Sequence, residues 1–299
     1  MPVSFTFDVE PHDRIEAAAG LSCPPDAQRE YARSMEASTR WLLDTLAGHD
    51  ARATFFVVGQ VATTHPRLIR DIGAAGHEVA CHSWDHRRVH HFTPTTFRRD
   101  VRRAKDALEQ AAGREVVGYR APTFSIGRET AWAIDVLAEE GFRYDSSVFP
   151  VRHDRYGVPD APRFPFRVYG HEHALLELPP ATLGLGGYNL PAAGGGYFRL
   201  FPPMVMRAAV RQAEKHPDGV PVLYFHPWEF DPDQPRLPLG RAGRFRTYVG
   251  IKRSRSRLRD LLSRYESRPM IDAADELGLR MLPTFRLGEP VEVGVRAAA

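Results

Sequence analysis

Short apolar runs alternate with amphipathic stretches between residue 3 and about residue 147. The apolar runs have the length and bounding residues of buried strands, and they cover Val3–Val9, Ala53–Val58, Glu78–Cys81, Val116–Tyr119 and Phe142–Asp145. Helical periodicity lies between them at 28–47, 68–75, 97–112 and 129–140, with helix ends expected at Gly48, Gly76, Gly113 and Gly141. Strands that alternate with helices at this spacing predict a parallel sheet or a (β/α) barrel.

The pattern changes between residues 148 and 200, where Pro and Gly become frequent. We expect loops over the barrel mouth here, with short strands at Ala174–Leu178 and Tyr197–Leu200. The later elements are predicted as a helix at Pro203–Lys215, a strand at Val220–Phe225, a basic helix at Lys252–Tyr265 and a last helix at Ile271–Leu277. With no internal repeat or Ser/Gly linker, we predict a single domain over 1–299, with a core at 3–230 and a C-terminal extension at 231–299.

Composition narrows the class of protein. Hydrophobic residues make up 43% and charged residues 26%, as in globular proteins, and a formal net charge of only +3 argues against nucleic-acid binding. The two cysteines, Cys23 and Cys81, support no disulfide framework. Apolar stretches fall short of the roughly 20 residues that span a bilayer, and the N-terminal residues lack a signal-peptide pattern, so we expect a cytoplasmic protein.

Positive charge is concentrated between Arg236 and Arg259. The simpler interpretation is a solvated helix with its neighbouring loops. The alternative is attraction to an anionic glycan or peripheral contact with an anionic membrane surface, and co-sedimentation with anionic vesicles would test the membrane contact.

Residues suited to metal binding and proton transfer follow several predicted strands. They are Asp8 and Glu10 after the first strand, the pair His82 and His86, Arg120, and His226. Function gathers at the C-terminal strand ends of such folds, so these residues predict one active site. Neutral imidazole is a common zinc ligand, and catalytic zinc has three protein ligands with one position open. Asp8 and Glu10, two apart on a strand, face the same way and can share that site.

Five segments taken in order resemble the motifs of the polysaccharide deacetylase family, carbohydrate esterase family 4, with its chitooligosaccharide-deacetylase homology domain. They are Thr-Phe-Asp-Val-Glu at 6–10, His-Ser-Trp-Asp-His at 82–86, Arg-Ala-Pro-Thr-Phe at 120–124, a weaker match at 144–147, and Leu-Tyr-Phe-His-Pro at 223–227. The stretches at 194–199 and 225–231 are similar to the branch found with bacterial exopolysaccharide and exosortase systems. The resemblance implies an α/β fold, a distorted (β/α) barrel with a Gly/Pro-rich insertion and a C-terminal helical extension.

The resemblance also implies a metal-dependent hydrolase that removes the N-acetyl group from an amino sugar of a bacterial exopolysaccharide or its lipid-linked precursor. It further implies peripheral contact with the exopolysaccharide synthesis machinery. His82 and His86 would hold one divalent metal ion, zinc before cobalt or nickel. The family's common first motif has two adjacent aspartates, but Val9 stands at the second position, so Glu10 is the expected third ligand and Asp13 the alternative. Asp8 would be the general base, with Arg120 orienting it.

The remaining roles implied by the resemblance concern the leaving group and the substrate. His226 would be the general acid, and Asp145 would adjust it through a hydrogen bond. A backbone N–H at Thr123 or Phe124 would bind the oxyanion. Trp84 and Trp228 are candidates for stacking on sugar rings because they adjoin motif residues, and core packing is the alternative for these aromatic side chains. Two other functions stay open: hydrolysis of a small cyclic imide or ureide on the same fold, and glycan binding without catalysis. The oligomeric state is not predicted.

Overall fold

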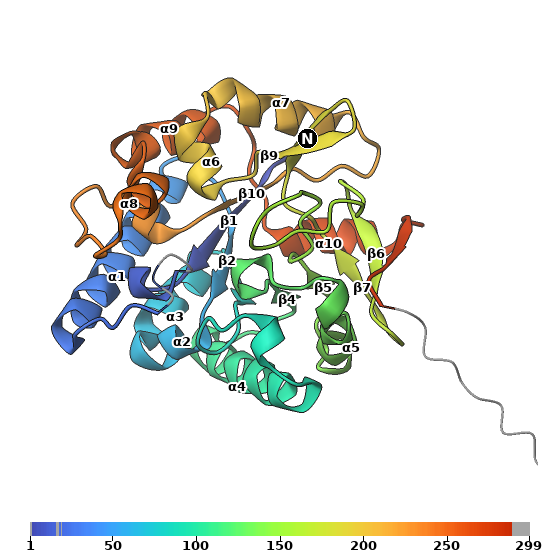
Figure 1. Ribbon diagram of the computed structural model, residues 1–299, viewed down its shortest axis with the longest axis horizontal. Coiled ribbons are helices and arrows are strands. Elements are labelled where there is room, and N and C mark those ends of the chain that lie inside the picture. The colour runs from blue at the N-terminus through green and yellow to red at the C-terminus, as the bar shows by residue number, and fades with distance from the viewer. Residues whose placement is uncertain (1, 16–17, 19, 289–299) are drawn as a thin grey trace, which may run out of the picture.

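The computed structural model describes residues 2–15, 18 and 20–288, and a nine-stranded sheet lies at the centre of this part of the chain (Figure 1). Its strand order is β10-β1-β2-β3-β4-β5-β7-β6-β11. Neighbours from β10 to β7 pair in parallel, whereas β6 is antiparallel to β7. The strands are β1 (Ser4–Val9), β2 (Thr54–Val57), β3 (Glu78–Cys81), β4 (Gly118–Tyr119), β5 (Tyr144–Asp145), β6 (Phe166–Tyr169), β7 (Ala174–Glu177), β10 (Val222–Phe225) and β11 (Thr284–Arg286).

Backbone contacts between the two ends of the parallel run close the sheet into a barrel. Pro180, just beyond β7, forms an isolated bridge with Val222 of β10, and the Ala181 N–H donates to the Val222 carbonyl oxygen at 3.0 Å. A second bridge joins Gly194 to Tyr224, where a Cβ at position 194 would lie 1.6 Å from the Tyr224 carbonyl oxygen. This crossing therefore requires glycine, and the predicted distorted (β/α) barrel is confirmed.

Helices surround the barrel on its outer side (Figure 1). They are α1 (Pro25–Ala47), α2 (Gly59–Thr64), α3 (Pro66–Ala74), α4 (Pro94–Ala112), α5 (Trp132–Glu139), α6 (Gly195–Leu200), α7 (Pro203–Glu214), α8 (Arg241–Tyr248), α9 (Ser254–Leu262) and α10 (Met270–Gly278). Of the predicted terminating glycines, Gly76, Gly113 and Gly141 have positive φ, but Gly48 ends α1 at φ −64°. No helix in the described residues has the length and apolar character needed to cross a membrane.

The two faces of the barrel strands pack into separate cores. Phe55 faces outward, where it contacts Phe7 at a ring-centroid distance of 5.1 Å beneath the surrounding helices. Its neighbour Phe56 faces the barrel interior with Tyr144 and residues of α10. Successive strand residues point to opposite faces, so a strand covered on both sides is apolar throughout, as the predicted runs are.

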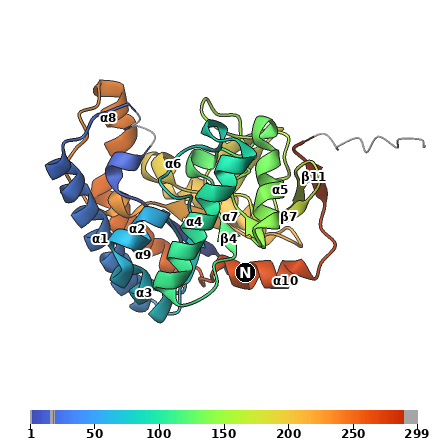
Figure 2. The ribbon, with the colours of Figure 1, turned by 90° about the horizontal axis from the view of Figure 1, so that it is seen from below.

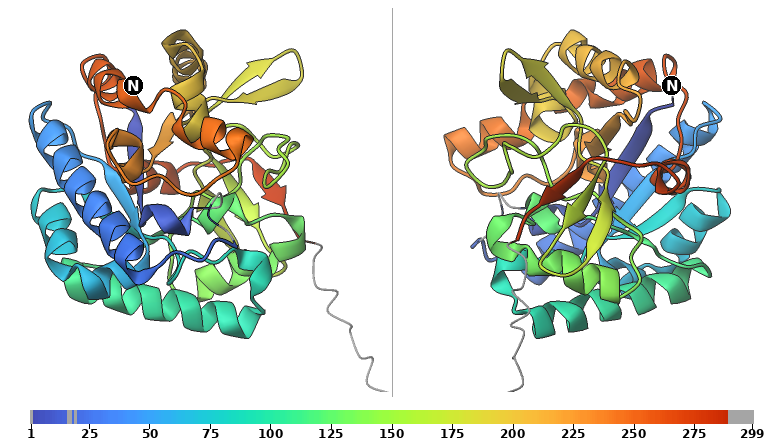
Figure 3. Two further views of the ribbon diagram at one scale, coloured as in Figure 1. Left: turned by 60° about the vertical axis from the view of Figure 1, so that its left-hand side comes forward. Right: turned by 90° about the vertical axis from the view of Figure 1, so that its right-hand side faces the viewer.

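Two sequence-based expectations about the 148–200 segment are wrong. Tyr197–Leu200 lies in helix α6, because a stretch of four residues is too short to show a period that distinguishes helix from strand. The segment also does more than cover the mouth: it contributes β7 to the barrel itself. A further hairpin, β8 (Thr182–Leu185) and β9 (Tyr188–Pro191), projects from the body on the positive-φ glycines Gly186 and Gly187 (Figure 3).

The C-terminal extension is helical as expected over α8, α9 and α10, with β11 added to the sheet edge, and residues 289–299 lie outside the described residues. Helix α10 closes the barrel at the N-terminal ends of its strands, opposite α8 (Figure 2). Its first N–H groups have side-chain acceptors from the sheet: Met270 donates to Thr54 Oγ1 at 2.7 Å and Ile271 donates to Glu78 Oε2 at 2.9 Å. Glu78 also accepts from the Tyr144 hydroxyl at 2.7 Å.

The substitution Glu78→Ala would leave the Tyr144 hydroxyl and the Ile271 N–H buried without their acceptor. We expect the free energy of unfolding to fall by about 3 kcal/mol, because unpaired buried donors keep their desolvation cost. Urea denaturation measures this, with Glu115→Ala at an exposed position as the matched control. Equal stability of the two variants would contradict the assigned role of Glu78.

Candidate active site

A cavity of about 290 Å³ opens at the C-terminal ends of the barrel strands. The carboxylates of Asp8 and Glu10, from the end of β1, line it together with His82, His86 and His226. Residues from α6, α8 and the loop after β5 form the outer wall. The side chains that the sequence placed at separate strand ends therefore meet in one cavity.

Glu10, His82 and His86 form a cluster suited to a divalent metal. One ligand atom from each residue lies within 4.8 Å of the other two, and each side chain is buried or nearly so. Glu10 Oε2 lies 2.7 Å from His86 Nε2 yet has no well-directed hydrogen bond of its own. A buried carboxylate oxygen and an imidazole nitrogen that converge without bonding fit a pair of ligands aimed at a common ion. Asp13, the alternative carboxylate, lies outside this cluster.

The charge states in the cluster also suit metal binding. Burial lowers the pKa of His82 to about 3, and the nearby His86 contributes in the same direction, so His82 is neutral at physiological pH. Its Nδ1 donates to the Arg120 carbonyl oxygen at 2.7 Å, which leaves Nε2 as the free ligand atom. Burial opposes ionisation of Glu10, but His86, His226 and His82 outweigh it and lower the pKa of this carboxyl group.

The backbone of the His82–His86 loop is strained at two residues. Ser83 and His86 have φ of 66° and 64°, a left-handed conformation that costs residues with a side chain of order 1 kcal/mol or more. Asp100 of α4 offsets this cost, because its Oδ2 accepts from the Ser83 hydroxyl and the Trp84 N–H, both at 2.9 Å. Thr123 and Phe124, on the opposite wall, have φ of 56° and 51°. Three of the five positive-φ residues other than glycine in the described chain thus line the cavity, and Ser83 adjoins the cavity residue His82.

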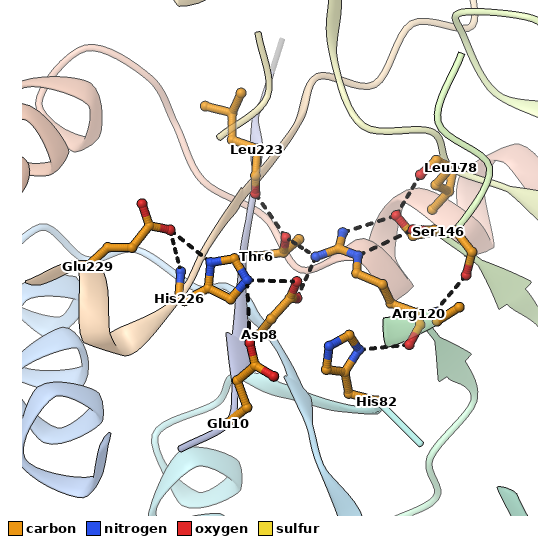
Figure 4. A network of polar contacts seen from close by, with 12 residues as sticks. Thr6, Asp8, Glu10, His82, Arg120, Ser146, Leu178, Leu223, His226 and Glu229 are labelled. Atoms are coloured by element: carbon orange, nitrogen blue, oxygen red, sulfur yellow. Dashed lines mark hydrogen bonds and ion pairs between the residues drawn. The ribbon is translucent and has the colours of Figure 1, made fainter. Parts of the chain in front are cut away.

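Arg120 is completely buried and fixes Asp8 (Figure 4). Its Nη1 donates to Asp8 Oδ1 and to Thr6 Oγ1, each at 2.7 Å, and its Nη2 donates to Ser146 Oγ at 3.0 Å. Thr6 and Ser146 in turn donate to backbone carbonyl oxygens, so the guanidinium is held on both sides. One oxygen of Asp8 is therefore occupied by Arg120, and the other, Oδ2, faces His226 Nε2 at 3.9 Å.

His226 is held by an acid that the sequence interpretation missed. Glu229 Oε1 accepts from His226 Nδ1 at 2.8 Å, while Glu229 Oε2 accepts from Arg199 Nε at 2.7 Å. Burial alone would lower the pKa of His226, but Glu229, with Glu10 and Asp8, raises it to about 8. His226 is therefore protonated at neutral pH, with Nε2 directed toward Asp8 and Glu10.

The structure places Asp145 elsewhere, so its expected contact with His226 is wrong. Asp145 Oδ1 accepts from the Ser147 hydroxyl at 2.6 Å, and burial raises the Asp145 pKa to about 6 beside Glu177. Sequence signals for the actual partners existed. Glu229 follows His226 by three residues across Pro227, a capping-box spacing, and Asp100 interrupts the apolar face of α4.

The predicted substrate-contacting residues divide into two groups. Thr123, Phe124 and Trp228 line the cavity, and Trp228 stacks on His226 at a centroid distance of 5.5 Å. The Phe124 N–H donates to the Ala121 carbonyl oxygen, so Thr123 remains the candidate for an oxyanion donor. Trp84 does not line the cavity; it packs against Gly59 under the Arg103 guanidinium, which corrects its predicted role in sugar stacking.

Some arginines of the basic segment between Arg236 and Arg259 donate hydrogen bonds within the protein. Arg257 donates to the carbonyl oxygens of Phe198, Arg199 and Phe201, and Arg255 donates to the Phe230 carbonyl oxygen. These arginines join α9 to α6 and to the turn after β10. The wholly solvated interpretation is therefore wrong for them, and the charge available to a partner is smaller than the sequence suggests.

Comparison with known proteins agrees with this geometry. A family model described as polysaccharide deacetylase matches residues 2–144, which contain Asp8, Glu10, His82, His86 and Arg120. Residues 2–144, nearly half of the chain, therefore match the polysaccharide deacetylase family. A second model, a domain of unknown function (DUF3473), matches residues 146–275 and corresponds to the exosortase-associated branch. The barrel takes strands from both matched segments, since β1 to β4 precede residue 145 and β7 and β10 follow it.

Individual relatives are similar over different lengths. The chitooligosaccharide deacetylase of Rhizobium leguminosarum bv. trifolii is 34% identical over 100 residues, which are 33% of this chain and 44% of that protein. The match thus spans less than half the length of this curated relative. A crystal structure described as a polysaccharide deacetylase from Mycobacterium smegmatis has a TM-score of 0.63 at 25% identity, over 94% of this chain and 91% of that one. PuuE allantoinase, with a TM-score of 0.59 at 16% identity over 92% and 89% of the two chains, shares the fold alone.

The cluster of Glu10, His82 and His86 predicts that the protein binds one divalent ion. We expect Glu10→Ala to lower zinc affinity by about 100-fold or more, because one of three protein ligands is lost. Asp13→Asn, at the alternative carboxylate, is expected to retain full affinity. Zinc titration with elemental analysis of both variants checks this, and loss of zinc from the Asp13 variant alone would overturn the assignment.

Proposed function

We propose that this protein is a metal-dependent hydrolase that removes the N-acetyl group from an amino sugar of a bacterial exopolysaccharide or of its lipid-linked precursor. The observation that supports this most directly is the pairing, in one cavity, of an arginine-bound carboxylate with a histidine, beside a cluster of residues suited to a metal ion. Amide hydrolysis requires a base for water and an acid for the departing amine. The site offers both.

Asp8 acts as the general base in this proposal. Arg120 and Thr6 fix its orientation, and Oδ2 remains directed into the cavity to accept a proton from water. A bound divalent metal, held by Glu10, His82 and His86, supplies Lewis acidity that makes water a better proton donor and polarises the acetyl oxygen.

His226 acts as the general acid. Its Nε2 faces the same space as Asp8 Oδ2, and the buried Glu229 and Arg199 pair holds the ring from behind. An amide nitrogen leaves as a neutral amine only when it is protonated, so a histidine charged at neutral pH suits this position. The Thr123 N–H, on the strained wall, is the proposed donor to the developing oxyanion.

The Asp8→Asn variant should lose nearly all acetate release from N-acetylchitohexaose, by about 1000-fold, because asparagine cannot accept the proton. Bound zinc should stay at one ion per chain, since Asp8 is not a ligand. Acetate assay and elemental analysis of the same preparation check both points. Retained turnover would exclude Asp8 as the base, and hydrolysis of a cyclic ureide without acetate release would favour the alternative substrate class.

The pH dependence of kcat/KM tests the acid. Because the folded-state pKa of His226 is raised to about 8, its acid form is present below that pH and is lost as pH rises through it. Removing the charge in Glu229→Gln should lower this pKa and move the alkaline limb of the profile down by about one pH unit. The exposed Asp233→Asn is the control. An unmoved alkaline limb in the Glu229 variant would contradict the role of His226.

A further inference from the structure

The mouth of the cavity carries positive charge that the proposed chemistry does not use. Arg155, in the loop after β5, and Arg246, on α8, both line the cavity, although they lie far apart in the sequence. Arg246 is 55% exposed and has only a 3.8 Å contact with Asp154, itself 63% exposed. Arg155 is also exposed. Exposed pairs of this length contribute little, so both guanidinium groups are available to a ligand.

Aromatic side chains lie beside these two arginines. Phe245 of α8 lines the cavity while 60% of it remains exposed, which is unusual for a large apolar side chain. Tyr156 and Tyr197 line the same wall, with His153 stacked on Tyr156 at a centroid distance of 4.0 Å. Flat apolar rings next to cations form a surface that suits a sugar ring bearing an acidic group.

Helix α8 is fixed in position rather than loosely attached. The buried Arg199 of α6 donates to the carbonyl oxygens of Thr247 and Val249, and Tyr248 Oη accepts from the Leu237 N–H at 2.7 Å. Arg199 is also the partner of Glu229, so the residue that supports His226 also anchors the helix carrying Arg246 and Phe245. The mouth therefore has a set geometry relative to the acid and base.

Charge is separated along the cavity. Its inner end carries the carboxylates of Asp8 and Glu10, which repel an anion unless metal is bound, whereas its mouth carries Arg155 and Arg246. A neutral N-acetyl group fits the inner end, and an anionic group fits only the mouth. The cavity therefore favours a substrate that carries a neutral N-acetyl group and an anionic group on the same molecule.

We propose that Arg155, Arg246 and Phe245 form a subsite for an anionic group, a carboxylate or a phosphate, on the part of the substrate next to the N-acetylated sugar. This inference rests on the proposed deacetylase function and narrows its substrate class to anionic glycans or phosphate-linked sugars. Arg155 and Arg246 bind the acidic group, and Phe245 packs on the adjoining sugar ring.

Equilibrium binding to the zinc-loaded Asp8→Asn protein tests the subsite without turnover. The probes are a hyaluronan hexasaccharide for a carboxylate, UDP-N-acetylglucosamine for a phosphate, and N-acetylchitohexaose as the neutral reference. We expect at least one anionic probe to bind about tenfold more tightly than the neutral one at low salt, with the difference lost near 0.5 M salt. Which anionic probe binds more tightly distinguishes the carboxylate from the phosphate.

Substitutions of the two arginines test whether they cause the preference for an anionic probe. Arg155→Gln and Arg246→Gln should each weaken binding of the preferred anionic probe by about threefold, and the double variant should remove the preference, with chitohexaose binding unchanged. Arg244→Gln, exposed on the same helix outside the cavity lining, is the matched control. The proposal is overturned if neither anionic probe binds more tightly than chitohexaose, or if the double variant keeps the preference.

Acetate release by the protein with Asp8 intact is measured separately on the same probes. Release without any charge preference in binding leaves the deacetylase function standing and removes the subsite. A charge preference that depends on Arg155 and Arg246, without acetate release from any probe, keeps the subsite as an anion-binding site and removes the proposed function.

Discussion

The buried guanidinium of Arg120 is the interaction on which the site depends. The Arg120 side chain donates hydrogen bonds to Asp8 and Thr6 of β1 and to Ser146 after β5. The Arg120 backbone carbonyl oxygen accepts a hydrogen bond from His82 Nδ1. One residue thus orients both the proposed base and a metal-binding histidine. Removing either Asp8 or Arg120 would leave the other charge buried without its partner. Such a change lowers the free energy of unfolding by about 3–5 kcal/mol.

Histidines of the site differ in charge because their neighbours differ. His82 is almost completely buried and lies next to His86, and burial lowers its pKa to about 3, which suits the proposed metal ligand. Burial also disfavours the charged form of His226, whose side chain is 18% exposed, but the carboxylates of Glu229, Glu10 and Asp8 raise its pKa to about 8, which suits the proposed acid. Chain position alone does not distinguish a neutral ligand from a charged acid; the difference lies in which carboxylates the fold brings near each ring.

The alternation of apolar runs and amphipathic stretches predicted a parallel sheet or a (β/α) barrel, and the resemblance of the motifs selected the barrel. The site residues could be predicted because chemistry-bearing side chains followed several of the strands. Prediction from the sequence was wrong where the local structure depends on contacts between segments that are distant in the chain. Trp84 adjoins a motif but packs under Arg103, and Tyr197–Leu200 is helical where Phe198 packs against Phe225 of β10. Glu229 and Asp100 carried local signals, whereas the convergence of Arg155 with Arg246 is visible only in the fold.

Anomalous diffraction from crystals of the zinc-loaded protein tests the central claim most directly, because it locates the ion and the base together. The account predicts one zinc peak about 2.0–2.2 Å from Glu10, His82 Nε2 and His86 Nε2, with Asp8 bonded to Arg120 and outside the coordination shell. A zinc ion bound by Asp8, or by Asp13 in place of Glu10, would contradict it.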